Sequence, residues 1–176
     1  MKYTLALIVV ALVALAVRHF LANQAAFVKP PYDAPAIKAV DQDGRELDFA
    51  ALYKKAITVV YFYPKADTPG CTKQGCSLRD AYADLTARGV QVLGVSVDTP
   101  EANKNFRDKF HLPFTLVSDP GGKVLEAFKV ARIPLIGLAT RQCFVVADGK
   151  VVWHDAKAST GKQADDIKDV LKELGK

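Results

Sequence analysis

The sequence has 176 residues, of which 50% are hydrophobic and 24% are charged. This length and composition predict one globular domain and exclude an intrinsically disordered chain. The formal net charge of +5 is modest, and the basic residues are scattered among acidic ones, which argues against a nucleic-acid-binding protein. Three cysteines are too few for a disulfide-stabilised scaffold, and the sequence contains no cluster with zinc-ligand spacing.

Residues 1–22 differ in composition from the rest of the chain. Lys2 is followed by an uncharged, apolar run from Tyr3 to Val17. This pattern is typical of an export signal or a membrane anchor. Cleaved and uncleaved forms both remain open, and Arg18 directly behind the run favours the uncleaved anchor. By analogy with export signals, we expect the domain to lie outside the cytoplasm, in the periplasm.

Residues 23–35 contain three prolines and predict a linker, followed by one domain over residues 36–176. Asp43-Gly44 predicts a β-hairpin near the start of this domain. Apolar runs and alternating patterns predict further strands at 56–63, 90–98, 114–119, 141–148 and 150–155. Helical periodicity and capping residues predict helices at about 69–88, 100–110, 122–128 and 163–174. Strands that alternate with helices indicate an α/β fold.

Cys71 lies where a predicted strand gives way to a predicted helix. Thr68 is a favourable N-cap residue and Pro69 suits the first helical position, so Cys71 falls in the first turn. The unpaired N–H groups and the positive end of the helix dipole favour a thiolate there, and they could hold an oxygen atom of a substrate. Cys71 is therefore a candidate nucleophile, and a buried, inert cysteine is the alternative.

Cys76 follows Cys71 by five residues on the same predicted helix. Five residues correspond to about 7.5 Å of rise and about 140° of rotation, which separates the Cα atoms by roughly 8–9 Å. Disulfides usually require Cα atoms within about 7 Å, so the pair cannot bond while the helix is intact. Gly75 would lower the cost of unwinding by roughly 1 kcal/mol relative to alanine. The chemistry that fits is a sulfenic acid on one cysteine, followed by helix opening and attack by the other.

The stretch YFYPKADTPGCTKQGC resembles the active-site motif of peroxiredoxins, Pro-x-x-x-Thr-x-x-Cys, with Pro64, Thr68 and Cys71 at the three motif positions. The second cysteine resembles the Q-type group, also called bacterioferritin comigratory proteins. The likeness extends from about Ala36 to Leu174. It implies a thioredoxin-like fold, with a central mixed sheet flanked by helices, that reduces hydrogen peroxide and organic hydroperoxides. It also implies that the reaction needs no metal, flavin or heme.

The resemblance implies a role for each motif residue. Cys71 would be the peroxidatic cysteine, and Cys76 would resolve its sulfenic acid into a disulfide. Thr68 would hydrogen-bond the peroxide, and Pro64 would shield the site from water. Arg141 matches the arginine of the family's equivalent strand, where a guanidinium would stabilise the charge that develops as the O–O bond breaks. Substrate contacts are expected from Thr68, Gly70, Cys71 and Arg141.

The resemblance further implies a monomer whose disulfide is reduced by a thioredoxin-like protein. A membrane-tethered redox sensor on the same fold is the alternative function. Cys143 departs from the serine or threonine expected in relatives, and it is either a small buried side chain or an additional thiol near the site. The segment 131–138 is shorter than in some relatives, so the rim of the pocket is not defined by the resemblance.

Overall fold

The structure is a computed structural model that describes residues 30–176. The predicted export or anchor segment, its hydrophobic helix and most of the predicted linker lie outside the described residues. Within the described part of the chain, no helix combines the length and the apolar character that crossing a membrane would need.

The described chain is built on one mixed sheet with the strand order β1-β8-β7-β4-β5-β6-β2-β3. The strands are β1 Tyr32–Asp33, β2 Lys38–Asp41, β3 Glu46–Asp48, β4 Ile57–Phe62, β5 Val90–Ser96, β6 Thr115–Ser118, β7 Gln142–Ala147 and β8 Lys150–Asp155. Strands β4, β5 and β6 are parallel to one another, and β7 runs antiparallel to β4. The predicted mixed sheet is therefore confirmed.

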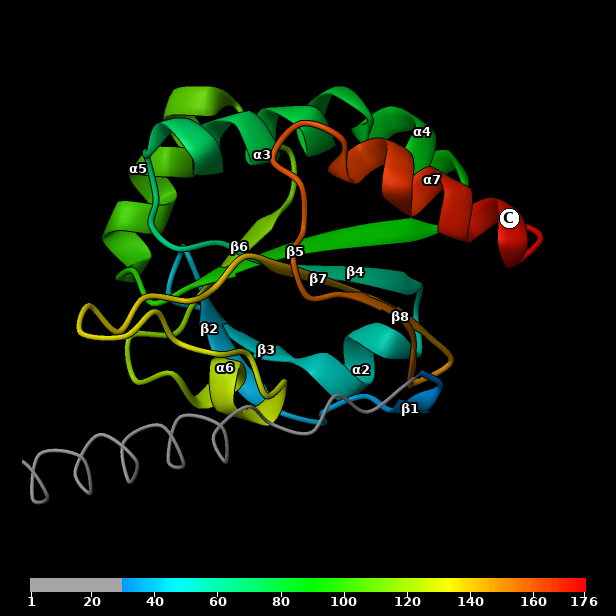
Figure 1. Ribbon diagram of the computed structural model, residues 1–176, viewed down its shortest axis with the longest axis horizontal. Coiled ribbons are helices and arrows are strands. Elements are labelled where there is room, and N and C mark those ends of the chain that lie inside the picture. Colours follow the sequence, from blue (N-terminus) through cyan, green and yellow to red (C-terminus); the bar gives the residue numbers. More distant parts are fainter. Residues whose placement is uncertain (1–29) are drawn as a thin grey trace, which may run out of the picture.

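Helices cover both faces of this sheet (Figure 1). They are α2 Phe49–Tyr53, α3 Pro69–Asp80, α4 Tyr82–Ala87, α5 Pro100–Phe110, α6 Lys123–Ala127 and α7 Gln163–Glu173. Helices α3, α4, α5 and α7 lie on one face, and α2 and α6 lie on the other. Alternate residues of β4 serve two cores, with Val59 and Tyr61 in one and Val60 and Phe62 in the other. A strand that is buried on both faces has an unbroken run of apolar residues, and this run is why the sequence predicts β4.

Two sequence predictions are wrong in detail. The helix predicted over 69–88 is two helices, because α3 ends at Asp80 and the N–H of Ala81 bonds back to the carbonyl of Arg79. No glycine or proline marks this break, so periodicity alone could not reveal it. The predicted linker over 23–35 includes Tyr32 and Asp33, which pair with Val151 and Lys150 of β8. The sheet therefore begins before residue 36.

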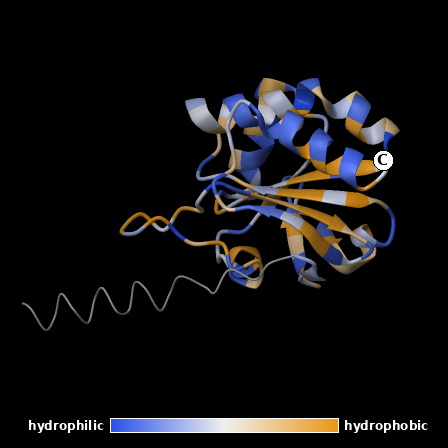
Figure 2. Cartoon of the chain, turned by 45° about the vertical axis from the view of Figure 1, so that its right-hand side comes forward, coloured by the Kyte–Doolittle hydropathy of each residue, from blue (hydrophilic) through white to orange (hydrophobic). Residues whose placement is uncertain are grey.

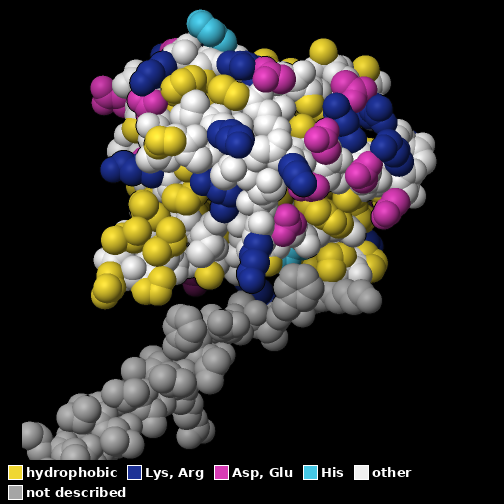
Figure 3. All heavy atoms as spheres, turned by 45° about the horizontal axis from the view of Figure 1, so that its top comes forward, with side chains coloured by type: hydrophobic (Ala, Val, Ile, Leu, Met, Phe, Trp, Pro, Cys, Tyr) yellow, Lys and Arg dark blue, Asp and Glu magenta, His cyan; other side chains and the backbone are white. Residues whose placement is uncertain are grey.

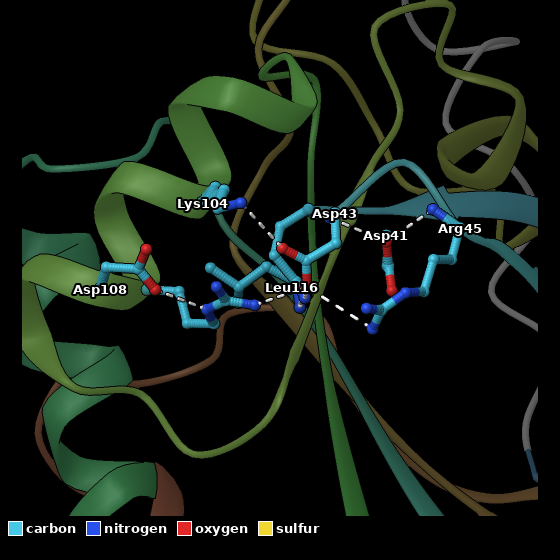
Figure 4. Close-up of polar contacts among 8 residues, drawn as sticks. Asp41, Asp43, Arg45, Lys104, Asp108 and Leu116 are labelled. Atoms are coloured by element: carbon cyan, nitrogen blue, oxygen red, sulfur yellow. Dashed lines mark hydrogen bonds and ion pairs between the residues drawn. The ribbon is translucent and has the colours of Figure 1, made fainter.

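The β2–β3 hairpin is attached to helix α5 through Asp43 (Figure 4). The Asp43 carboxylate accepts a hydrogen bond of 2.8 Å from Arg107 Nη1 and lies 3.4 Å from Lys104 Nζ. Gln42 Nε2 donates to the same carboxylate, and Gln42 Oε1 accepts from the Leu116 N–H of β6. The hydrogen bonds from Arg107 and Gln42 hold the pKa of Asp43 well below its usual range. The edge hairpin is therefore held against α5 by ion pairs and against β6 by a hydrogen bond, in addition to its own turn.

Replacing Asp43 with asparagine should lower the thermal unfolding midpoint at pH 7. Because the folded state lowers the pKa of Asp43, its contribution is complete above the unfolded value of about 4 and is lost as the pH falls below it. The difference from wild type should therefore shrink between pH 5 and pH 2 in calorimetric scans. Asp169→Asn, which removes only an exposed pair with Lys172, should have little effect at either pH. An equal difference at pH 7 and pH 2 would contradict this account.

Candidate active site

Cys71 is the third residue of α3, as the capping residues predict. Thr68 is the N-cap with extended backbone angles, and Pro69 is the first helical residue. The first helical hydrogen bond runs from Thr72 N–H to Thr68 O at 2.8 Å. Cys71 precedes this bond, so its N–H belongs to the unpaired first turn, and its side chain is only 1% exposed. Its sulfur therefore lies in a sheltered position at the positive end of a helix.

Thr68 holds the preceding loop instead of capping the helix with its side chain. Its hydroxyl donates to Lys65 O at 3.0 Å, and no capping bond from this side chain is present in α3. A hydroxyl oxygen that donates its proton to the loop keeps its lone pairs available as acceptors. Pro64 is half-buried at the start of the same loop, two residues after β4. The structure thus places Pro64, Thr68 and Cys71 along one short connection.

Arg141 meets Cys71 because of the sheet register. Phe62, the last residue of β4, pairs with Gln142, the first residue of β7. The loop that leaves β4 and the residue that precedes β7 therefore lie at the same edge of the sheet. Arg141 Nη2 donates to Cys71 Sγ at 3.4 Å. The structure thus places the Arg141 guanidinium within hydrogen-bonding distance of the Cys71 sulfur.

Gly70 makes room for this contact. A Cβ atom at residue 70 would lie 3.3 Å from Arg141 Nη2 and 3.7 Å from Thr160 Cγ2. The first distance is short enough that the guanidinium would have to shift. Thr160 belongs to the segment between β8 and α7, which therefore lies against the first turn of α3. Gly70 thus allows the arginine and this segment to close on the first turn of α3.

Gln74 is a site residue that the sequence analysis did not identify. Arg141 Nη1 donates to Gln74 Oε1, and the Gln74 side chain is fully buried. Arg141 is therefore held by α3 at two points, the sulfur of Cys71 and the amide of Gln74. A polar residue on the buried face of a helix, between Cys71 and Leu78, was the available signal.

A second polar network holds the loop between β4 and α3. Asp98 Oδ2 accepts from Ala66 N–H at 2.7 Å and from Ser96 Oγ at 2.8 Å. Tyr63 Oη donates to the buried Asn103 of α5 at 2.6 Å. These bonds tie the loop to the end of β5 and to α5. The position of Cys71 is consequently fixed by the sheet and by two helices.

Cys76 lies on the same intact helix as Cys71, and its side chain is half-buried. All three cysteines are free, and the helical spacing keeps Cys71 and Cys76 beyond disulfide reach, as predicted. Cys76 opens into a groove of about 480 Å³ between α3 and α7. Other residues that line this groove include Lys73, Ser77, Asp80, Ala164 and Lys168.

Cys143 is fully buried in the core that also contains Cys71 and Tyr61. Burial raises the pKa of the Cys143 thiol well above its ordinary value, and the nearby Asp155 carboxylate acts in the same direction. A thiol that stays protonated is a poor nucleophile. The structure thus favours the first of the two alternatives for Cys143, a small buried side chain.

The segment before Arg141 forms a small hairpin. Arg132 and Ala139 form a bridge, and Ile133 N–H donates to Leu138 O at 2.7 Å. Leu135 and Ile136 at its tip are exposed, and the hairpin projects as an apolar loop in Figure 2. On the face drawn in Figure 3, basic and acidic side chains are interspersed and form no basic stripe.

Within residues 30–176, no group of three or more histidine, cysteine, aspartate or glutamate side chains could hold a metal ion. The arrangement at Cys71 instead offers a sheltered sulfur, a guanidinium and the N–H groups of a helix start. These groups can hold an oxygen atom next to the sulfur and stabilise negative charge that develops on it.

The sequence model of the AhpC/TSA family matches residues 31–154. The chain is 42% identical to a chloroplastic peroxiredoxin Q of Populus jackii over 118 residues, which are 67% of this chain and 55% of that protein. It is 43% identical to a putative peroxiredoxin of Mycobacterium tuberculosis over 129 residues, which are 70% of this chain and 82% of that protein. The chain thus spans little more than half the length of the first of these relatives.

A solved structure of the bacterioferritin comigratory protein of Xanthomonas campestris, described in connection with alkyl peroxide reduction, shares the fold. Its TM-score is 0.75 at 28% sequence identity, and the match covers 85% of this chain and 99% of that one. The chain belongs to the AhpC/TSA family, and within this family to the Q-type peroxiredoxins. The thioredoxin-like fold expected from the sequence is confirmed.

Cys143 should resist alkylation in the folded protein. At neutral pH, iodoacetamide should modify Cys76 at least about a hundredfold faster than Cys143, because the Cys143 thiol is buried and its raised pKa keeps it protonated. A time course of peptide mass spectrometry measures both rates in one sample. Denatured protein is the control, in which the two rates should be similar. Comparable rates in the folded state would show that Cys143 is accessible and reactive.

Proposed function

We propose that the chain is a thiol peroxidase in which the Cys71 thiolate attacks a hydroperoxide. The observation that carries the proposal is the hydrogen bond of 3.4 Å from Arg141 Nη2 to Cys71 Sγ at the start of α3. The sulfur forms a bond with the nearer peroxide oxygen as the O–O bond breaks. The other oxygen leaves as an alkoxide or hydroxide and takes a proton to become an alcohol or water. Cys71 is thereby oxidised to a sulfenic acid.

Arg141, Thr68 and Gly70 act on the peroxide in this proposal. The guanidinium next to the sulfur would stabilise the negative charge that moves from sulfur to the leaving oxygen. The Thr68 hydroxyl and the N–H of Gly70 lie in the same first turn and would orient the peroxide, while Pro64 would limit the access of water. Hydrogen peroxide and organic hydroperoxides are the proposed substrates, since the similar Xanthomonas campestris protein is described as reducing alkyl peroxides.

Cys76 completes the proposed cycle after α3 opens. Its thiol attacks the sulfenic sulfur of Cys71, a disulfide forms, and water leaves. The helical separation of the two cysteines makes unwinding of the first turns of α3 a necessary step. A thioredoxin-like dithiol would then reduce the disulfide and become a disulfide itself. The groove beside Cys76 gives solvent access to that thiol before the helix opens.

The proposed location outside the cytoplasm rests on the composition of residues 1–22 alone. Their apolar run predicts an export signal or an anchor, and the segment lies outside the described residues. Fractionation of the source cells, with mass spectrometry of the N-terminus, would distinguish an anchored from a cleaved form.

Peroxide consumption in the presence of a dithiol reductant tests the proposed activity. Wild type should consume hydrogen peroxide over many turnovers, and Cys71→Ser should consume none. Cys143→Ser is the matched control and should retain turnover, because Cys143 takes no part. A single stoichiometric oxidation of wild type would instead favour the redox sensor. Full activity of Cys71→Ser would overturn the assignment of the reacting thiol.

Gly75→Ala should slow disulfide formation without slowing the first oxidation. A Cβ at residue 75 would lie 3.4 Å from the Leu112 methyl groups, an ordinary contact, so the helix accepts alanine. Alanine stabilises a helix interior by roughly 1 kcal/mol relative to glycine, which corresponds to an approximately fivefold slower unwinding step. Rapid-quench mass spectrometry separates the two steps.

The matched control for this substitution is Gly121→Ala. Residue 121 has open space around its Cβ position and lies outside α3, so disulfide formation should proceed at the wild-type rate. If Gly75→Ala formed the disulfide as fast as wild type, helix unwinding would not limit the resolving step.

A further inference from the structure

Two buried amides connect Arg141 to the C-terminal helix. Arg141 Nη1 donates to Gln74 Oε1, and Gln74 Nε2 donates to Gln163 Oε1. Gln74 and Gln163 are 0% and 1% exposed, so water does not compete for these bonds. Gln74 lies in α3, and Gln163 is the first residue of α7. One chain of hydrogen bonds therefore joins the arginine next to β7 to two helices.

The direction of this chain depends on the orientation of the Gln74 amide. A glutamine amide has an acceptor at Oε1 and donors at Nε2, and a half-turn of the amide exchanges their places. A guanidinium has only donors, so it requires Oε1 to face it. If Nε2 faced Arg141, two donors would oppose each other in a buried site, at a cost in free energy. Arg141 itself favours this orientation of the amide, and a hydrogen bond on the other side of the amide would hold it there more firmly.

Gln163 Oε1 supplies the constraint, because it accepts the proton of Gln74 Nε2 on the side away from Arg141. Neighbouring groups hold Gln163 itself in place. The first turn of α7, which carries Gln163, packs beside the buried Cys143 side chain. The segment that leads into α7 is anchored by the hydrogen bond of 3.3 Å from Ala158 N–H to Arg141 O.

We propose that Gln163 is a positioning residue of the active site. By fixing the orientation of the Gln74 amide, it fixes the acceptor that holds the Arg141 guanidinium on Cys71. The inference rests on the proposed function in one respect, namely that Cys71 is the reacting thiol. It adds a residue of α7, 89 positions from Gln74 in the sequence, to the groups that set the rate of the first step.

The same series of hydrogen bonds makes the position of Arg141 depend on whether α3 is helical or unwound. Gln74 lies between Cys71 and Cys76, so unwinding of the turns between them removes the acceptor from Arg141 and breaks the contact with Gln163. The arginine is consequently positioned when α3 is helical and Cys71 can react. It is released when α3 opens for disulfide formation.

Substitution of Gln163 in two backgrounds tests the proposal. Gln163→Leu keeps the volume of the side chain and removes the acceptor, so the rate constant for Cys71 oxidation by hydrogen peroxide should fall about three- to tenfold. Gln163→Glu keeps an acceptor oxygen for Gln74 Nε2, so it should restore part of the rate, and the burial of the carboxyl group limits the recovery. Stopped-flow measurement of a single oxidation gives the rate constant.

The decisive comparison uses Gln74→Glu. A carboxylate has two acceptor oxygens and presents one to Arg141 in either orientation, so Gln163 has nothing left to orient. In this background Gln163→Leu should change the rate less than twofold relative to Gln74→Glu alone. An equal loss in both backgrounds would mean that Gln163 acts only through the packing of α7, and the proposal would be wrong.

One further measurement and one further variant make each outcome decisive. Denaturant unfolding of every variant reports whether the packing is preserved. Gln163→Met also lacks an acceptor, and it replaces the leucine variant if that variant folds poorly. If wild type itself fails to react with peroxide at Cys71, the proposed function is wrong. If wild type reacts rapidly and Gln163→Leu reacts equally fast, the proposed function stands and the positioning role is wrong.

Discussion

The rest of the site depends on the position of the Arg141 guanidinium. This group donates hydrogen bonds to the sulfur of Cys71 and to the amide oxygen of Gln74. It joins two segments that are 70 residues apart in the sequence. The antiparallel register of β4 with β7 brings these segments to one edge of the sheet. Gly70 then allows close approach, and the network around Asp98 fixes the loop that carries Cys71. The sheet thus brings the sulfur and the guanidinium close together, and buried polar groups fix the orientation of the guanidinium.

In the proposed cycle, helix α3 has to satisfy two opposing demands. It must be well formed while Cys71 reacts, because its first turn shelters the sulfur and its buried face carries Gln74. It must then open, because an intact helix keeps Cys76 out of reach of Cys71. Gln74 and Leu78 anchor the helix to the core, whereas Gly75 weakens it and Cys76 is partly open to solvent. This balance between anchoring and weakness is consistent with a helix that opens locally without loss of the whole fold.

The sequence predicted local features best. The strands of the sheet centre are apolar runs, and the start of α3 is marked by Thr68 and Pro69, so both could be located from short windows. Arg141 carries no local signal, and only its resemblance to the family motif placed it next to Cys71. The break at Ala81, the short strand at Tyr32 and the link from Gln74 to Gln163 were missed. The strand at Tyr32 and the link from Gln74 to Gln163 depend on contacts between distant segments, which periodicity and capping patterns do not contain. The break at Ala81 is a local change of hydrogen bonding that no glycine or proline marks.

The central claim is that Cys71 reacts while α3 is helical and that Cys76 reaches it only after the helix opens. Amide hydrogen exchange, measured together with disulfide mapping after oxidation by one equivalent of peroxide, tests this most directly. The account predicts protected amides over α3 in the reduced protein, and a Cys71–Cys76 disulfide with rapid exchange over the same residues in the oxidised protein. A disulfide from Cys71 to Cys143, or a Cys71–Cys76 disulfide with α3 still fully protected, would contradict it.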